Sequence, residues 1–314
     1  MKISMASVAL VVGLGVALAG CDRIGMLKAK MAFKSANTLY QQQDYRKAAQ
    51  KYEEALAADP KLTYAYFFLG NSYDNLYKPG RKGESAANDV LLTKAIDNYR
   101  KAAEVEQDPK IKRLALEYLV SAYGPDKLND PSQAEPMVKR MIDLDPKEPA
   151  NYFALANIYE QSGNYDLAEQ TLIKAREVRP NDPAVYMQLA GYYNRQGEFD
   201  KTIEALEARA QKEPSNPEAY YTIATYYWDK AYRDFRLREA DKKKFVQSGV
   251  DAVDKAISLK NDYMEALVYK NLLLRLQANL EKDQAKQQAL LKEADRLRDL
   301  AQEIRKKRAA GVGN

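Results

Sequence analysis

The sequence predicts an all-α fold built from helical hairpins that follow one another along the chain. Two observations carry this prediction. A set of positions recurs with a period of about 34 residues, and apolar residues within each half of the unit recur at helical spacing. The repeating positions are Tyr152, Leu155, Ala156, Tyr159, Gly163, Ala168, Leu172, Ala175 and Pro180 in one stretch, and Tyr186, Leu189, Ala190, Tyr193, Gly197, Thr202, Leu206, Arg209 and Pro214 in the next.

Each half of the repeating unit has the pattern of an amphipathic helix. In the first half, Tyr152, Leu155 and Tyr159 form one apolar stripe, and the second half shows the same spacing. Gly163 lies between the two halves, where the chain must turn. Glycine adopts the left-handed conformation of such a turn with the lowest energetic cost. Pro180 cannot continue a helix and therefore ends the unit. One hairpin cannot bury its own stripe, so neighbouring hairpins are expected to stack.

These positions resemble the tetratricopeptide repeat (TPR), and the resemblance extends from about residue 29 to the C-terminus. It implies a right-handed α-solenoid of about seven TPR helical hairpins. Six repeats are predicted over residues 29–263, and residues 264–308 are predicted as a degenerate seventh repeat with a C-terminal capping helix. Residues 309–314 are predicted to be a disordered tail.

Two hairpins depart from the period, each by an insertion of the same length. The interval from Gly70 to Ala95 equals that from Ala224 to Gly249, and both are about twice the corresponding interval of a regular unit, which runs from Ala156 to Ala168. The insertion in the sixth hairpin contains no proline or glycine, so both helices there are predicted to lengthen by about two turns. The other insertion contains Pro79 and is predicted to combine a loop with a lengthened second helix. Each tip is either a tolerated insertion or a contact point for another molecule.

The N-terminus has the layout of a secretory signal. Lys2 supplies a positive charge, residues 8–18 supply an apolar run, and small residues precede Cys21, the only cysteine. The apolar run is shorter than the roughly 18 to 20 residues that span a bilayer. An uncleaved membrane anchor and a chance cysteine are the alternative interpretations.

The segment around Cys21 resembles the lipobox of bacterial lipoproteins. The resemblance implies a signal peptide over residues 1–20, a diacylglyceryl thioether on Cys21, and a short linker over residues 21–28. The product is expected to be anchored in the bacterial cell envelope, with its repeats facing the periplasm. Asp22 resembles an inner-membrane retention signal of enteric bacteria, but the sequence leaves open whether the inner or the outer membrane holds the protein.

Composition argues against an enzyme, a metal protein and a nucleic-acid-binding protein. The chain contains no histidine and one cysteine, which removes the commonest general base and any Cys/His metal cluster. The 49 Lys and Arg residues nearly balance the 44 Asp and Glu residues, so no strong field favours nucleic acid. The segment from Gly80 to Ser85 lacks the spacing of a phosphate-binding loop. No cofactor is expected.

The first helices of the hairpins predict a peptide-binding groove. In TPR arrays these helices line the concave face, and a Phe-x-x-x-Asn pattern recurs there in three hairpins of this chain. Asparagine can donate to and accept from a peptide bond, and an aromatic ring offers an apolar floor. The predicted groove residues are Phe33, Asn37, Phe67, Asn71, Phe153, Asn157, Met187, Tyr221 and Trp228.

Several interpretations of this surface stay open. The phenylalanines could contact the neighbouring hairpin, and asparagine is common on helical surfaces. The predicted function is a lipid-anchored TPR scaffold or adaptor for envelope proteins or extended peptide segments, with an assembly or recruitment role. Two alternatives are a binding protein for glycan strands, which would use exposed aromatic residues such as Tyr226, and a structural component that self-associates through the seventh hairpin.

Overall fold

In the computed structural model, the described residues form α-helices and one short 3-10 turn, with no strand. The structure describes residues 5–81 and 86–311, with side chains from residue 23 onward apart from Arg81. Fourteen α-helices follow one another in this part of the chain, which confirms the all-α prediction. Residues 1–4 of the predicted signal peptide and residues 312–314 of the predicted tail lie outside the described residues.

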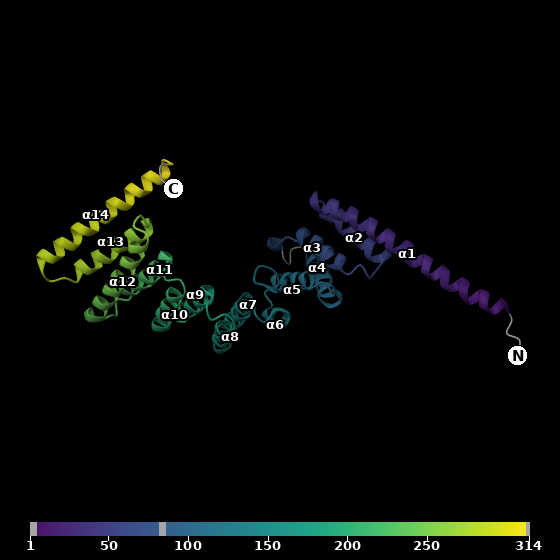
Figure 1. Cartoon of the computed structure of the whole chain (residues 1–314), viewed down its shortest axis with the longest axis horizontal. Coiled ribbons are helices and arrows are strands. Elements are labelled where there is room, and N and C mark those ends of the chain that lie inside the picture. The colour runs from purple at the N-terminus through teal and green to yellow at the C-terminus, as the bar shows by residue number, and fades with distance from the viewer. Residues whose placement is uncertain (1–4, 82–85, 312–314) are drawn as a thin grey trace. The chain divides into compact units, whose positions relative to one another are not determined.

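The helices pair in sequence order, and each odd-numbered helix is the first helix of a hairpin (Figure 1). Their bounds are α1 Met5–Gln41, α2 Tyr45–Ala58, α3 Tyr64–Leu76, α4 Ala86–Val105, α5 Pro109–Tyr123, α6 Pro131–Leu144, α7 Pro149–Gln161, α8 Tyr165–Val178, α9 Pro183–Arg195, α10 Phe199–Lys212, α11 Pro217–Arg233, α12 Glu239–Leu259, α13 Met264–Asn279 and α14 Gln284–Ala309. The chain divides into two compact units, Met1–Ala168 (unit 1) and Glu169–Asn314 (unit 2).

Small residues allow the two helices of a hairpin to approach closely. A Cβ atom added at Gly70 of α3 would lie 2.8 Å from the Tyr99 ring and 3.0 Å from the carbonyl oxygen of Ala95, both in α4. A Cβ atom at Gly249 of α12 would lie 3.2 Å from the Cβ of Tyr227 in α11. Close packing of this kind leaves no room for an extra methyl group unless a neighbour moves.

The turns between helices are set by the residues that the repeat pattern singles out. Gly163 and Gly197 have φ angles of 75° and 77°, in the left-handed region that glycine adopts most readily. At the start of the fourth and fifth hairpins, a tyrosine hydroxyl donates back to the carbonyl of the preceding proline. These bonds join Tyr152 to Pro146 at 2.9 Å and Tyr186 to Pro180 at 2.7 Å.

A second set of tyrosines joins successive hairpins. The Tyr159 hydroxyl donates to Glu135 Oε1 at 3.0 Å within unit 1, and the Tyr193 hydroxyl donates to Glu169 Oε1 at 2.9 Å within unit 2. Burial and the hydrogen bond to Glu169 raise the pKa of Tyr193 to about 12. The tyrosine therefore stays protonated and keeps its donor over the physiological pH range.

The two insertions lengthen helices by different amounts. In the second hairpin α3 keeps 13 residues, a short 3-10 turn follows at Pro79–Arg81, and α4 has 20 residues, as predicted. In the sixth hairpin α12 has 21 residues and α11 has 17, against 14 and 13 in the regular pair α10 and α9. The gain in α12 matches the two turns predicted, whereas α11 gains only about one turn.

Asp234 explains why α11 ends early. Its carboxylate accepts hydrogen bonds from the backbone N–H of Arg236 at 3.1 Å and from Lys230 Nζ at 3.0 Å. These bonds hold a turn over residues 234–238 that reverses the chain before α12 begins. Phe235, in this turn, is 89% exposed.

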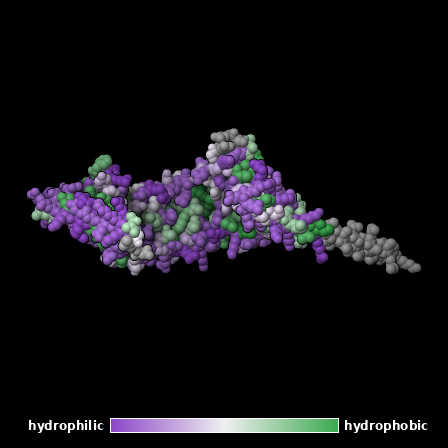
Figure 2. Space-filling view, turned by 90° about the horizontal axis from the view of Figure 1, so that it is seen from above, coloured by the Kyte–Doolittle hydropathy of each residue, from purple (hydrophilic) through white to green (hydrophobic). Residues whose placement is uncertain are grey.

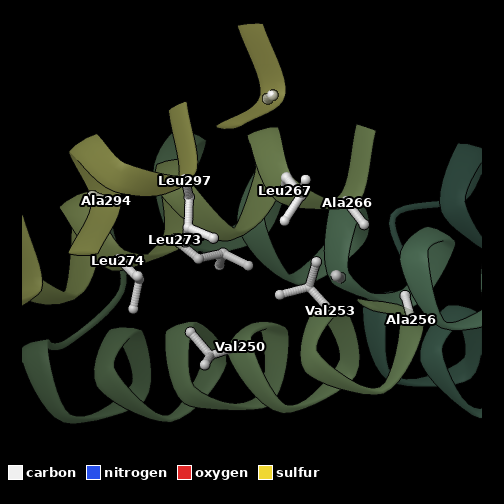
Figure 3. Close-up of a cluster of buried hydrophobic side chains, with 11 residues drawn as sticks. Val250, Val253, Ala256, Ala266, Leu267, Leu273, Leu274, Ala294 and Leu297 are labelled. Atoms are coloured by element: carbon white, nitrogen blue, oxygen red, sulfur yellow. The ribbon is translucent and has the colours of Figure 1, made fainter. Parts of the chain in front are cut away.

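The seventh hairpin packs on the sixth through an apolar core. The core contains Leu267, Leu273 and Leu274 of α13, Leu297 of α14, and residues of α11 and α12 (Figure 3). Leu267, Leu274 and Leu297 lie within residues 264–308, where the sequence predicted a degenerate seventh repeat. The outer part of α14 is rich in charged residues, as expected of a capping helix.

The first helix runs continuously through the predicted linker. Residues 21–28 lie within α1, and a Cβ atom added at Gly25 would lie 2.9 Å from the carbonyl oxygen of Ala58 at the end of α2. Hairpin 1 therefore begins without a flexible tether after Cys21, whose side chain lies outside the described residues. Within the part of the chain that the structure describes, no helix has both the length and the apolar character needed to cross a membrane.

We expect alanine at Gly70 and at Gly191 to have opposite effects. Gly70→Ala should lower the free energy of unfolding by about 1–3 kcal/mol, because the new methyl group collides with a ring and a backbone carbonyl. Gly191→Ala, inside α9, meets only the end of the flexible Arg195 side chain at 3.3 Å and should raise it by about 0.5–1 kcal/mol. Denaturant unfolding followed by circular dichroism measures both. Equal effects of the two substitutions would contradict this packing.

We also expect unit 2 to lose stability at alkaline pH. A tyrosine whose folded pKa is raised from 10 to about 12, as for Tyr193 and Tyr221, contributes stability that is complete below pH 10. That contribution falls as the pH rises through 12. Unfolding measured between pH 9 and pH 12 should show this loss, and Tyr193→Phe should reduce its slope. An unchanged slope in Tyr193→Phe would assign the loss to other groups.

Candidate functional site

The first helices of unit 1 line an open polar pocket, which we call the unit 1 pocket. It has a volume of about 420 Å³. Its lining comes from α1, α3, α5 and the loops that follow α3 and α5. The lining residues are Tyr40, Asn71, Asp74, Asn75, Tyr77, Pro79, Tyr118 and Lys127.

A chain of hydrogen bonds fixes the floor of the unit 1 pocket. The Tyr40 hydroxyl and the Asn75 side-chain amide both donate to the Asn71 side-chain oxygen, the latter at 2.9 Å. Lys127 Nζ donates to Asp74 Oδ1 at 2.5 Å. The side chains of Lys127 and Asp74 are only 15% and 10% exposed, so water screens this ion pair weakly.

Tyr77 adds a hydroxyl that has no hydrogen-bond partner among the described residues. Its side chain is 5% exposed, and no described residue accepts or donates a hydrogen bond at its hydroxyl oxygen. Burial, with smaller contributions from Asp89 and Asp74, raises the pKa of Tyr77, so this hydroxyl keeps its proton. A buried polar group of this kind is uncommon in a folded protein.

The structure brings only one predicted groove residue of unit 1 into this pocket, namely Asn71. Phe67 is 7% exposed, and its ring contacts those of Tyr99 and Tyr118 at 5.9 and 5.4 Å. Phe33 likewise contacts Tyr64 of the next hairpin, with ring centroids 4.7 Å apart. Phe67 is therefore a packing residue between hairpins, whereas Phe33 is partly exposed beside the rings that it contacts. A groove-lining role for these rings stays a prediction.

The predicted asparagines also differ in their surroundings. Asn71 is 5% exposed, so it belongs to the buried floor of the pocket and not to an open surface. Asn37 is half-buried and accepts a hydrogen bond of 2.6 Å from the Tyr52 hydroxyl. Asn157 is exposed on α7, beside a partly exposed Phe153. The Phe-x-x-x-Asn pattern therefore contributes mainly to packing in the first two hairpins and is more accessible in the fourth.

Unit 2 has its own cavity among its first helices, which we call the unit 2 pocket. Its volume is about 270 Å³. The lining residues are Asn194 of α9, Thr225, Tyr226, Trp228, Asp229 and Arg233 of α11, and Tyr269 of α13. Trp228 was predicted for this surface. Met187, also predicted, is 36% exposed on α9 but does not line the cavity.

Aromatic rings form a ladder beside the unit 2 pocket. Tyr221 contacts Tyr263 and Tyr269 with ring centroids 5.2 and 5.4 Å apart, and Tyr269 contacts Trp228 at 5.6 Å. Trp228 stacks on Tyr232 at 4.9 Å, with the two ring planes 10° apart. Burial and the neighbouring tyrosines raise the pKa of Tyr221 to about 12. The predicted Tyr221 is therefore part of this ladder, in contact with the seventh hairpin.

Sequence reasoning missed most of the residues that line the pockets. In unit 1 the available signal was the spacing of Asn71 and Asn75, which lie one turn apart on one helical face. Lys127 gave no signal, because it reaches Asp74 from a loop 53 residues away. In unit 2 the spacing of Tyr221 and Trp228, two turns apart, predicted a shared face but not their contact with Tyr269.

Both pockets offer hydrogen bonds and ring contacts, the chemistry of binding. In the part of the chain that the structure describes, no three His, Cys, Asp or Glu side chains come together in a way that could hold a metal ion.

Family comparisons identify the repeat. Three models described as tetratricopeptide repeat match residues 33–110, 127–190 and 183–226. Together these ranges include all of α3, α7 and α9 and parts of α1 and α11, and they leave out most of α5. No curated protein matches the chain.

Solved structures of similar fold are TPR proteins. The C-terminal part of a TPR repeat-containing protein from Cytophaga hutchinsonii is 19% identical with a TM-score of 0.56, covering 84% of this chain and 95% of that one. A tetratricopeptide repeat protein from Parabacteroides merdae is 16% identical with a TM-score of 0.45, covering 85% and 99%. The MamA protein is 19% identical with a TM-score of 0.45, covering 67% and 98%. The Cytophaga match supports the fold alone. The chain is thus built of tetratricopeptide repeats and folds as an all-α TPR solenoid.

Proposed function

We propose that this protein is a lipid-anchored adaptor of the bacterial cell envelope that binds extended segments of partner proteins. TPR arrays in general are scaffolds for protein interaction and are not enzymes. The finer assignment, to an envelope protein with an assembly or recruitment role, rests on the N-terminal sequence and on the chemistry of the pockets.

The unit 1 pocket carries the proposal, because it complements both halves of a peptide bond. Both N–H groups of the Asn75 side chain are directed at Asn71, at 2.8 and 2.9 Å, which leaves the Asn75 side-chain oxygen as an acceptor for a ligand N–H. Lys127 has three N–H groups, and the described residues give it one acceptor, Asp74. The remaining N–H groups of Lys127 can therefore donate to a ligand carbonyl.

The N-terminal sequence supports an envelope location. Cys21 follows a short apolar run and two small residues, the arrangement that resembles a lipobox. Because α1 continues from this cysteine into the first hairpin, an acyl chain on Cys21 would hold unit 1 close to the membrane. Catalysis plays no part in this proposal.

The aromatic ladder of unit 2 favours a second candidate function. Ring faces such as those of Trp228 and Tyr232 can stack on the apolar faces of sugar rings, and the neighbouring polar groups Asn194 and Arg233 can bind hydroxyl groups. Binding of glycan strands is therefore the alternative for this surface. Binding of purified cell-wall glycan that disappears in Trp228→Ala would support it.

We expect Asn75→Ala to weaken binding of a partner protein about tenfold, because one hydrogen bond to the ligand is lost. The measurement is capture of envelope proteins, identified by mass spectrometry, on wild-type and variant chains. Asn98→Ala is a matched control. Its side-chain amide makes the same 2.8 Å bond to the carbonyl one turn earlier as Asn75 does, but in the second helix α4. Equal capture by both variants would count against the unit 1 pocket.

We expect Cys21→Ser to abolish acylation, since serine offers no thiol for the thioether bond. Intact mass of the wild-type protein should exceed that of the polypeptide by a diacylglyceryl group, and the variant should lack this increment. Cell fractionation should then show less of the variant in membranes. A wild-type mass equal to that of the unmodified chain would refute the lipoprotein assignment.

A further inference from the structure

The first helix carries an exposed apolar stripe at an end of the repeat array. Ile24, Leu27 and Met31 are 58%, 63% and 66% exposed. At about 3.6 residues per turn they lie within about 60° of the helix circumference. Ala29 and Ala36, which are fully buried, lie on the opposite side of the helix. The stripe therefore points away from the hairpin core.

Basic residues flank the stripe on both sides. Lys28 lies along one edge, and Arg23, Lys30 and Lys34 lie along the other. All four side chains are exposed, and no described carboxylate is within ion-pair distance of them. An apolar stripe edged by long cations is the pattern of a helix that lies in the interface of an anionic bilayer.

The apolar character is confined to the segment nearest Cys21. Farther along the same side of α1 the exposed residues are Ser35 and Thr38. A protein that covered the whole outer side of hairpin 1 would need apolar contacts along its full length, whereas a membrane surface close to Cys21 needs them only here. Figure 2 shows hydrophobic atoms where the described side chains of α1 begin, and a mostly hydrophilic surface on α14.

We propose that this face of α1, residues 23–34, lies in the headgroup region of an anionic bilayer and fixes the orientation of hairpin 1 on the membrane. The proposal rests on the proposed function, because acylated Cys21 is the adjacent anchor. Along the helix axis Ile24 lies about 4.5 Å and Met31 about 15 Å from Cys21, at about 1.5 Å per residue. Three apolar side chains enter the acyl boundary while the four cations meet anionic headgroups.

The test uses tryptophan as a depth reporter. Trp228 is the only tryptophan, so Trp228→Phe provides a silent background. In it, Leu27→Trp places a reporter on the stripe, and Thr38→Trp places a matched reporter on the polar end of the same helix side. The full chain, purified from membranes, is reconstituted into vesicles with and without phosphatidylglycerol, and quenching by lipids brominated in the acyl chain is measured.

We expect quenching several-fold stronger for Leu27→Trp than for Thr38→Trp, and stronger with phosphatidylglycerol than without. Replacing Lys28, Lys30 and Lys34 by glutamine should remove the effect of phosphatidylglycerol. Equal quenching at the two positions, quenching indifferent to phosphatidylglycerol, or a dimer that shields residue 27 without vesicles would each overturn the proposal. Protein mass separates the two hypotheses: an acylated chain without quenching refutes the stripe alone, and a quenched chain without acyl groups refutes the lipoprotein assignment alone.

Discussion

The close approach of two helix backbones inside each hairpin is the constraint on which the rest of this structure depends. Gly70 shows it most clearly, because the Tyr99 ring and the Ala95 carbonyl of the partner helix occupy the space of its missing side chain. The gap between one hairpin and the next is wider than the gap between the two helices of a hairpin. Larger side chains fill this wider gap, as the Phe67 ring does where it contacts Tyr118 of the next hairpin. Successive first helices then lie near enough to share the lining of one pocket.

The features that repeat were predictable from sequence because they depend on local chemistry. A positive φ angle at Gly163 and the end of a regular repeat at a proline such as Pro180 follow from the conformational limits of those residue types. The length of α11 was not predictable in this way. The residues after Arg233 are compatible with a helix, and the helix ends because Asp234 binds Lys230 and Arg236 in a particular turn.

The candidate site was only partly predictable, for a related reason. Helical periodicity and the resemblance to TPR arrays assigned Phe33 and Phe67 to the concave side of the first helix, but periodicity contains no information on the distance to the next hairpin. The distance to the next hairpin decides whether such a ring lines an open groove or packs against the neighbouring helix. The unit 1 pocket also needs Lys127, which approaches Asp74 from a loop after the third first-helix. A repeat period of about 34 residues does not predict contacts between residues this far apart in sequence.

The helices α1 and α14 each have a side that no other hairpin covers, and the residues on these two sides differ. In α14, Ala294, Leu297 and Ala301 are buried and the remaining surface is rich in Lys, Arg, Glu and Asp, so water alone can cover it. In α1 the outward side near Cys21 is apolar, with Lys28 along one edge and Arg23, Lys30 and Lys34 along the other. In water, exposed apolar area is energetically unfavourable, and cations without a partner contribute little to the stability of the fold. Both features become favourable on an anionic membrane surface, which is why the proposed membrane contact is assigned to this side of α1 and not to α14.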